Sequence, residues 1–123
     1  MNEKILYTAG HMWVLPNEDG TYSAGITDYA QDLLGDIVFV DAPKTGTLLN
    51  SGSPCGTIES VKTGSDLIAP LTGVVEETNQ ILESTPERIN ESPLATWIFK
   101  FRPTKGEDNN LMTYKEYQEL ISS

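Results

Sequence analysis

GTIESVKTGSDLIAPLTG, residues 56–73, is the stretch that decides the fold. Ile58 and Val61 can face inwards from a strand that leads to Lys62, and after Thr-Gly-Ser a second strand opens with Asp66. The pattern predicts a β-hairpin with a lysine at or beside its tip. Such a lysine is suited to acylation by another enzyme because its ammonium lies far from the core. Taken alone, however, a lysine in a turn is most often an ordinary solvated residue.

Short apolar runs recur along most of the chain and predict a mainly β fold, either a sandwich or a barrel. The expected strands cover residues 12–15, 21–26, 37–41, 55–62, 67–69, 73–77 and 97–102. The segments between them are rich in Gly, Pro, Asn and Ser, which favour turns.

Helices are expected at two places. TDYAQDLLG, residues 27–35, begins with a capping side chain at Thr27 or Asp28 and ends at a glycine. A second helix, residues 114–121, can be capped by Thr113. One or two short helical turns are expected within residues 79–93, and residues 103–110 are expected to form an exposed connection.

The charge of the chain narrows the classes of partner. The 123 residues, enough for one domain, include 18 Asp and Glu against 8 Lys and Arg, a net charge of −10. Nucleic acids and anionic membrane surfaces require basic patches, so neither is an expected partner. A basic protein partner suits this surface better, although net charge alone can serve solubility.

Metal sites, disulfides and catalytic pairs have little support in the composition. Cys55 is the only cysteine and His11 the only histidine, so no internal disulfide and no Cys/His metal cluster is expected. The chain has no apolar run of membrane-spanning length and no signal-peptide pattern, and we expect a cytoplasmic protein. Cys55 is interpreted as a small buried side chain, and Trp13, Trp97 and Phe39 as core.

Five blocks of the sequence together resemble the H protein family of the glycine cleavage system. They are HMWV (11–14), GITDYAQDLLGDIVFVDAP (25–43), ESVKTGSDLIAPLTGVVEETN (59–79), INESPLATWIFKF (89–101) and YKEYQ (114–118). The resemblance implies a mainly β barrel-sandwich hybrid of the lipoyl and biotinyl carrier type, with short flanking helices and a C-terminal helix. Residues 1–123 would form a single lipoyl-carrier domain.

The resemblance also implies the chemistry. Lys62 aligns with the lysine that carries lipoate, so the protein would be a carrier and not an enzyme. Its arm would pass an aminomethyl group, and reducing equivalents, between glycine decarboxylase (P protein), aminomethyltransferase (T protein) and dihydrolipoyl dehydrogenase (L protein). A lipoyl ligase or lipoyl transferase would attach the lipoate, and the carrier would be a monomer.

Residues around Lys62 have implied roles in this comparison. Glu59, Ser60, Val61 and Asp66 would take part in recognition by the lipoylating enzyme. For Glu59 and Asp66 recognition is favoured over the alternative of merely solvated acidic groups. Biotin carriers usually place their lysine between two methionines, whereas Lys62 lies between valine and threonine, which favours lipoate.

The cleft that would shelter the arm departs from the family pattern. It would be lined by His11, Met12 and Tyr29, but the family usually has His-Glu-Trp where this chain has His-Met-Trp. Because a thioether cannot favour an ammonium as a carboxylate does, an alternative is an H-like lipoyl relay, or a lipoyl carrier in another pathway such as sulfur metabolism. An enzyme in its own right is disfavoured by the lack of a recognisable nucleophile–base pair.

Overall fold

The computed structural model describes residues 4–104 and 111–122, and its described residues form two antiparallel sheets with four short helices. The expected connection at 103–110 lies mostly outside the described residues. The larger sheet has six strands in the order β1 (Leu6–Tyr7), β2 (Met12–Pro16), β3 (Tyr22–Ile26), β9 (Phe99–Pro103), β8 (Gly73–Thr78) and β5 (Leu48–Leu49). The smaller has the order β4 (Ile37–Asp41), β6 (Pro54–Ser60) and β7 (Gly64–Ile68).

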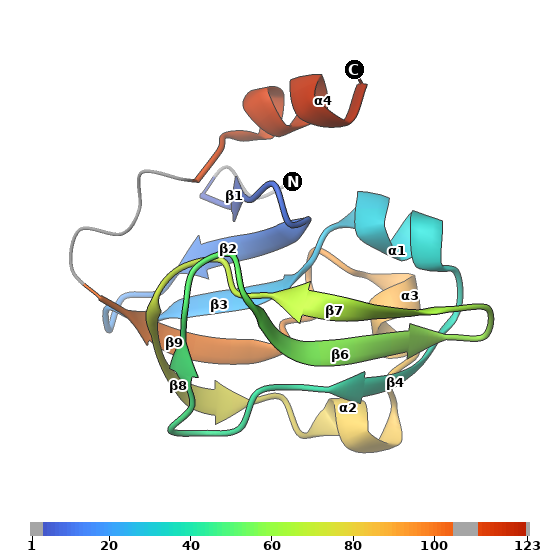
Figure 1. Ribbon diagram of the computed structural model, residues 1–123, viewed down its shortest axis with the longest axis horizontal. Helices are drawn as coiled ribbons and strands as arrows, with labels where there is room; N and C mark the ends of the chain where they lie inside the picture. Colours follow the sequence, from blue (N-terminus) through green and yellow to red (C-terminus); the bar gives the residue numbers. More distant parts are fainter. Residues whose placement is uncertain (1–3, 105–110, 123) are drawn as a thin grey trace.

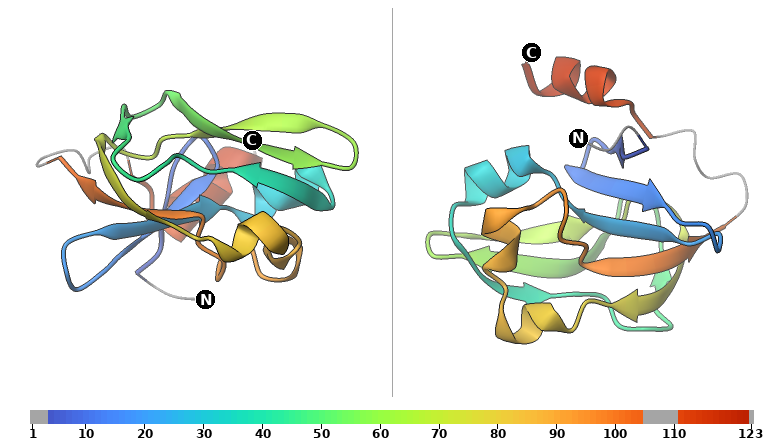
Figure 2. Two further views of the ribbon diagram at one scale, coloured as in Figure 1. Left: turned by 90° about the horizontal axis from the view of Figure 1, so that it is seen from below. Right: turned by 180° about the vertical axis from the view of Figure 1, so that it is seen from behind.

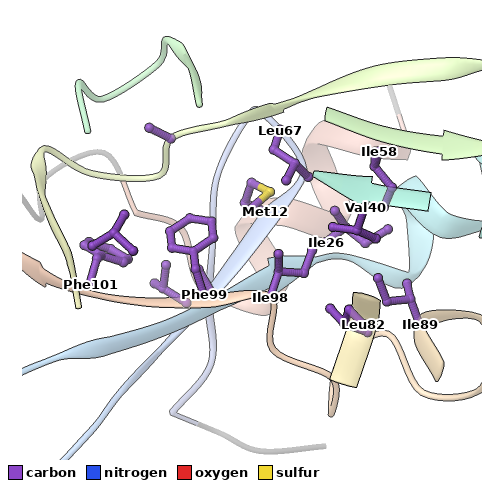
Figure 3. Packing of buried hydrophobic residues seen from close by; sticks show 14 of the residues in the cluster. Met12, Ile26, Val40, Ile58, Leu67, Leu82, Ile89, Ile98, Phe99 and Phe101 are labelled. Carbon is purple, nitrogen blue, oxygen red and sulfur yellow. The ribbon is translucent and has the colours of Figure 1, made fainter. Parts of the chain in front are cut away.

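The two sheets pack face to face, and the view from below in Figure 2 shows them as two layers. Side chains from both layers fill the space between them, as Figure 3 shows for Met12, Ile58, Leu67, Ile98 and Phe99. Each of these five side chains is at most 1% exposed. The mainly β, two-sheet architecture expected from the sequence is therefore confirmed.

Some individual predictions of burial were wrong. Val61 is 70% exposed and Phe39 50% exposed, whereas both were expected to face inwards. The strand expected to run to Lys62 ends at Ser60, so Val61 lies in the turn, outside the strand alternation. Trp13 is buried as expected and Trp97 is half-buried.

The helices follow the capping signals in the sequence. In α1 (Asp28–Leu34), Thr27 Oγ1 accepts a hydrogen bond from Ala30 N, and the helix ends at Gly35 with φ 87°. The C-terminal helix α4 (Tyr114–Ser122) begins with a capping box, because Thr113 and Glu116 exchange side chain to backbone bonds. The short turns expected in residues 79–93 are α2 (Ile81–Ser84) and α3 (Arg88–Glu91).

α4 lies outside the two-sheet sandwich, beside β1 (Figure 1). Its Tyr117 is fully buried in a second apolar cluster with Ile5, Tyr7 and Trp13, and its ring stacks on that of Tyr7 at 4.9 Å. Tyr114, in the first turn of the same helix, is 43% exposed. Tyr117 is thus the buried residue of this helix, and Ile121 packs against the same cluster while the Tyr114 ring contacts that of Tyr7.

Candidate functional site

The β6–β7 hairpin carries Lys62 at its closed end, which forms one extremity of the molecule (Figure 1). Glu59 and Gly64 are the last paired residues, so residues 60–63 form the turn. Ser60 N donates to the Thr63 carbonyl at 2.8 Å and closes the turn.

The Ser60 side chain organises this turn from inside. Its Oγ accepts from Thr63 N at 3.1 Å and from Lys62 N at 3.3 Å, and donates to the Thr63 carbonyl at 3.1 Å. The residue is 9% exposed. Serine oxygens commonly stabilise turns in this way. The side chain is thus engaged in shaping the turn, a role that the sequence analysis had not assigned to it.

Lys62 lies over the end of α1. Val61 N donates to the Asp36 carbonyl at 3.0 Å, which ties the turn to the segment following the helix. A Cβ on Gly35 would lie 3.3 Å from Lys62 Cε, so the lysine stem passes directly over this glycine. The side chain is exposed and forms no ion pair within the described residues. Its ammonium is therefore accessible to another protein.

The other residues predicted for recognition lie at different distances from the tip of the hairpin. Glu59 and Val61 are exposed beside Lys62, on the last strand position and in the turn. Asp66 is exposed too, but it pairs with Thr57 and so lies further from the tip. Only Glu59 and Val61 therefore share the immediate surface of the lysine.

A cavity of about 130 Å³ lies between α1, the start of β2 and the β6–β7 hairpin. It is lined by Gly10, His11, Met12, Ile26, Ala30, Leu33, Leu34, Ile58, Ser65 and Asp66. Two of the three residues predicted for the arm cleft, His11 and Met12, are thus in its wall. Tyr29 lies outside the lining, but its ring contacts that of His11 at 5.1 Å. Leu33 and Leu34 belong to the helix whose end Lys62 crosses, so the lysine and the cavity are neighbours.

His11 adopts an unusual backbone conformation at the cavity wall. Its φ is 65°, the left-handed region that few residues other than glycine adopt. Its Nδ1 lies 2.8 Å from the Tyr117 hydroxyl, which in turn lies 2.8 Å from Thr27 Oγ1. Burial lowers the pKa of His11, which favours the neutral imidazole. Sequence reasoning had not joined Thr27 or Tyr117 to this site, since each had been assigned only to its own helix.

A second hollow, of about 720 Å³, borders the other side of the turn and is strongly acidic. Val38 and Val61, both exposed, adjoin it together with the carboxylates of Asp36, Glu83, Glu87 and Glu91. Its composition is suited to a basic protein segment with some apolar surface. A pocket of about 510 Å³ lined by Trp13 and Trp97 includes none of the hairpin residues.

Two other kinds of site are not supported. The part of the chain that the structure describes contains no group of three His, Cys, Asp or Glu side chains that could hold a metal ion. Burial raises the pKa of the half-buried Cys55 thiol to about 11, so this cysteine is a poor nucleophile at neutral pH. In the same described residues, no helix is long and apolar enough to cross a membrane.

Comparisons with known proteins agree over almost the whole chain. The family model described as "Glycine cleavage H-protein" matches residues 5–123. A "Glycine cleavage system H protein" of Methylobacillus flagellatus is 56% identical over 119 residues, 97% of this chain and 96% of the relative. A Thermus thermophilus protein with the same description is 44% identical over 95% of this chain and 92% of its own. The crystal structure of a glycine cleavage system H protein from Mycobacterium marinum covers 100% of both chains, with a TM-score of 0.89 and 36% identity.

Proposed function

Because the chain belongs to the glycine cleavage H-protein family, we propose that it acts through a lipoyl group attached to Lys62. The family is the lipoyl carrier of the glycine cleavage system and is not itself an enzyme. The observation that carries the proposal is the Ser60-organised turn, which presents an exposed lysine without an ion pair at the end of a hairpin.

The residues around Lys62 suit an amide-linked arm. The absence of a Cβ at Gly35 leaves room for the lysine stem beside α1, and the small cavity with His11, Met12 and Asp66 in its wall lies next to that helix. A bound lipoyl group would supply a dithiolane that accepts and releases the aminomethyl group and two electrons. The chain's own part is to tether the arm, keep its lysine accessible and offer its far end a partly apolar shelter.

The acidic hollow beside the turn is the proposed docking surface for the partner enzymes. Glycine decarboxylase, aminomethyltransferase, dihydrolipoyl dehydrogenase and a lipoyl ligase or transferase must each bring their active sites to the arm. Carboxylates beside Val38 and Val61 favour basic surfaces on such partners and would speed their encounter. This surface supports transient docking by a monomeric carrier.

Met12 is the observation that bears on the alternative of a lipoyl relay or a carrier in sulfur metabolism. Its side chain is 1% exposed and contributes an apolar wall to the cavity, where a carboxylate would favour an ammonium. Glycine cleavage is the better supported setting, since the relatives carry that name. Met12→Glu should strengthen retention of an aminomethyl cargo in the arm, measured as slower release of ammonia from the loaded protein.

The test of the proposal is site-specific modification. The protein is incubated with lipoate, ATP and a lipoyl ligase, alongside Lys62→Arg and the matched control Lys44→Arg, a substitution at another exposed lysine. Intact mass and peptide mapping should show one lipoyl adduct on Lys62, present in the control and absent from Lys62→Arg. An unmodified Lys62 in the presence of an active ligase would refute the proposal.

A further inference from the structure

Three polar side chains from distant parts of the chain form a buried hydrogen-bonded chain behind the cavity wall. His11 precedes β2, Thr27 caps α1 and Tyr117 belongs to α4. Thr27 and Tyr117 are fully buried, at 0% exposure. The backbone adds a further link, because Thr27 N donates to the His11 carbonyl at 3.1 Å. The contacts therefore fix both the backbone and the ring of His11.

The hydroxyl of Thr27 determines the direction of this chain. Its oxygen accepts from Ala30 N at 3.1 Å as the helix cap, and its own proton also needs an acceptor because the residue is buried. Within the described residues, the acceptor within reach of that proton is the Tyr117 oxygen at 2.8 Å. Thr27 therefore donates to Tyr117, and Tyr117 is left to donate its own proton to His11 Nδ1.

The protonation state of His11 follows from this direction. A ring nitrogen that accepts a hydrogen bond carries no proton, so the single proton of the neutral imidazole lies on Nε2. If Nδ1 carried a proton, the Tyr117 proton would turn towards Thr27 and the buried Thr27 hydroxyl would lose its acceptor. The same loss would accompany the imidazolium, which is protonated on both nitrogens.

We infer that Tyr117, supported by Thr27, is a positioning residue that holds His11 as the neutral Nε2–H imidazole in the wall of the arm cavity. This inference rests on the proposed function for the use of the cavity. The groups facing His11 are Tyr29 of α1, Tyr117 of α4 and Asp66 of β7, which lines the same cavity. Burial and the hydroxyl chain both oppose a positive ring, although a carboxylate lines the same cavity.

A neutral His11 gives the cavity a defined chemical preference. His11 then adds no positive charge to a wall that also contains the Ser65 hydroxyl and the Asp66 carboxylate. An arm end that carries a protonated amine is not repelled by such a wall, whereas an imidazolium would repel it. The ligand class implied is a thioether sulfur bearing a small ammonium group.

Nuclear magnetic resonance of the imidazole nitrogens tests the inference directly. His11 is the only histidine, so its ¹⁵N signals are unambiguous. The unmodified wild-type protein should show the Nε2–H tautomer. In Tyr117→Phe the neutral ring loses an accepted hydrogen bond, so the tautomers should mix and the His11 pKa should rise by about half a unit to one unit. Thr27→Ser keeps the hydroxyl and should behave as the wild type.

Thr27→Val provides a second measurement should Tyr117→Phe fail to fold. Without the Thr27 oxygen, the buried Tyr117 proton has only His11 Nδ1 as acceptor, so this variant should keep the Nε2–H tautomer and its His11 pKa should not rise. The inference is overturned if wild-type His11 carries its proton on Nδ1, if folded Tyr117→Phe keeps the wild-type tautomer and pKa, or if the His11 pKa rises in folded Thr27→Val. Because the protein is unmodified, these outcomes are independent of whether Lys62 accepts lipoate.

Discussion

Replacing Ser60 by alanine removes the oxygen around which the lysine-bearing turn is built. The variant loses one donated and two accepted hydrogen bonds, all within residues 60–63. Water can replace the lost partners at Lys62 and Thr63, since both residues are exposed. We therefore expect the three lost bonds together to cost less than the sum of their usual individual contributions, a loss of about 1 kcal/mol in the free energy of unfolding.

This loss should be measurable both in the stability of the whole domain and in the hydrogen exchange of the turn. For a domain of this size, about 1 kcal/mol corresponds to a fall in Tm of roughly 4 °C. Hydrogen exchange at the amides of Lys62 and Thr63 should accelerate about fivefold, because both lose their acceptor oxygen. Urea unfolding followed by tryptophan fluorescence measures the first effect, and exchange followed by NMR measures the second.

The matched control is Ser65→Ala on the neighbouring strand. The Ser65 hydroxyl makes only a long, exposed bond of 3.4 Å to the Asp66 carbonyl, so its removal should change stability by less than about 0.5 kcal/mol. The proposed role of Ser60 predicts in addition that its alanine variant is lipoylated more slowly than the control. Equal stability and equal exchange rates in the two variants would refute the reasoning.

Three further predictions follow from single side chains. Gly56→Ala should destabilise the fold by about 2 kcal/mol or more, because the added Cβ would collide with the Asp41 carbonyl oxygen. Its control, Gly64→Ala, should be tolerated because the added Cβ would make only ordinary contacts. Chemical denaturation measures both free energies of unfolding. Glu87→Lys should lower kcat/KM of lipoylation several-fold at low salt, because it places a positive charge in the acidic hollow. Glu18→Lys, which lies away from the hollow, should not. An equal effect of the two substitutions would contradict docking of the lipoylating enzyme at the hollow. The free energy of unfolding should fall as pH rises from 9.0 towards about 11, because the Cys55 thiol loses its proton at lower pH in the unfolded chain than in the folded one. Cys55→Ala should reduce this dependence of stability on pH, measured by urea unfolding at several pH values.

The fold was predictable where local patterns were strong. Alternation and turn residues located seven strands, and capping residues at Thr27 and Thr113 located both of the expected helices. β1 and β5 were missed, because two residues are too few to show a periodicity. Phe39 was wrongly assigned to the core, since its exposure depends on a register shift between Ile37 and Phe39 where β4 pairs with β6.

The candidate site was predictable only where it depends on residues close together in the sequence. Lys62 and its turn are determined over a few residues, and the resemblance to the family singled out His11 and Met12. The sequence indicated an acidic surface suited to a basic partner but did not locate it. Glu83 and Glu87 lie beside Val61 only because α2 and α3 pack near β4. The role of Ser60 inside the turn, which sets the local geometry of the lysine, was missed.

The sequence by itself determined the mainly β class, the hairpin that displays Lys62 and the ends of the helices, because these depend on interactions between residues close along the chain. Only the tertiary structure decided the surroundings of the arm. His11 meets a hydroxyl 106 positions away, and Thr27 meets the same hydroxyl from 90 positions away. No periodicity or spacing encodes such contacts, because they form only when α4 packs against the elements at the start of the chain.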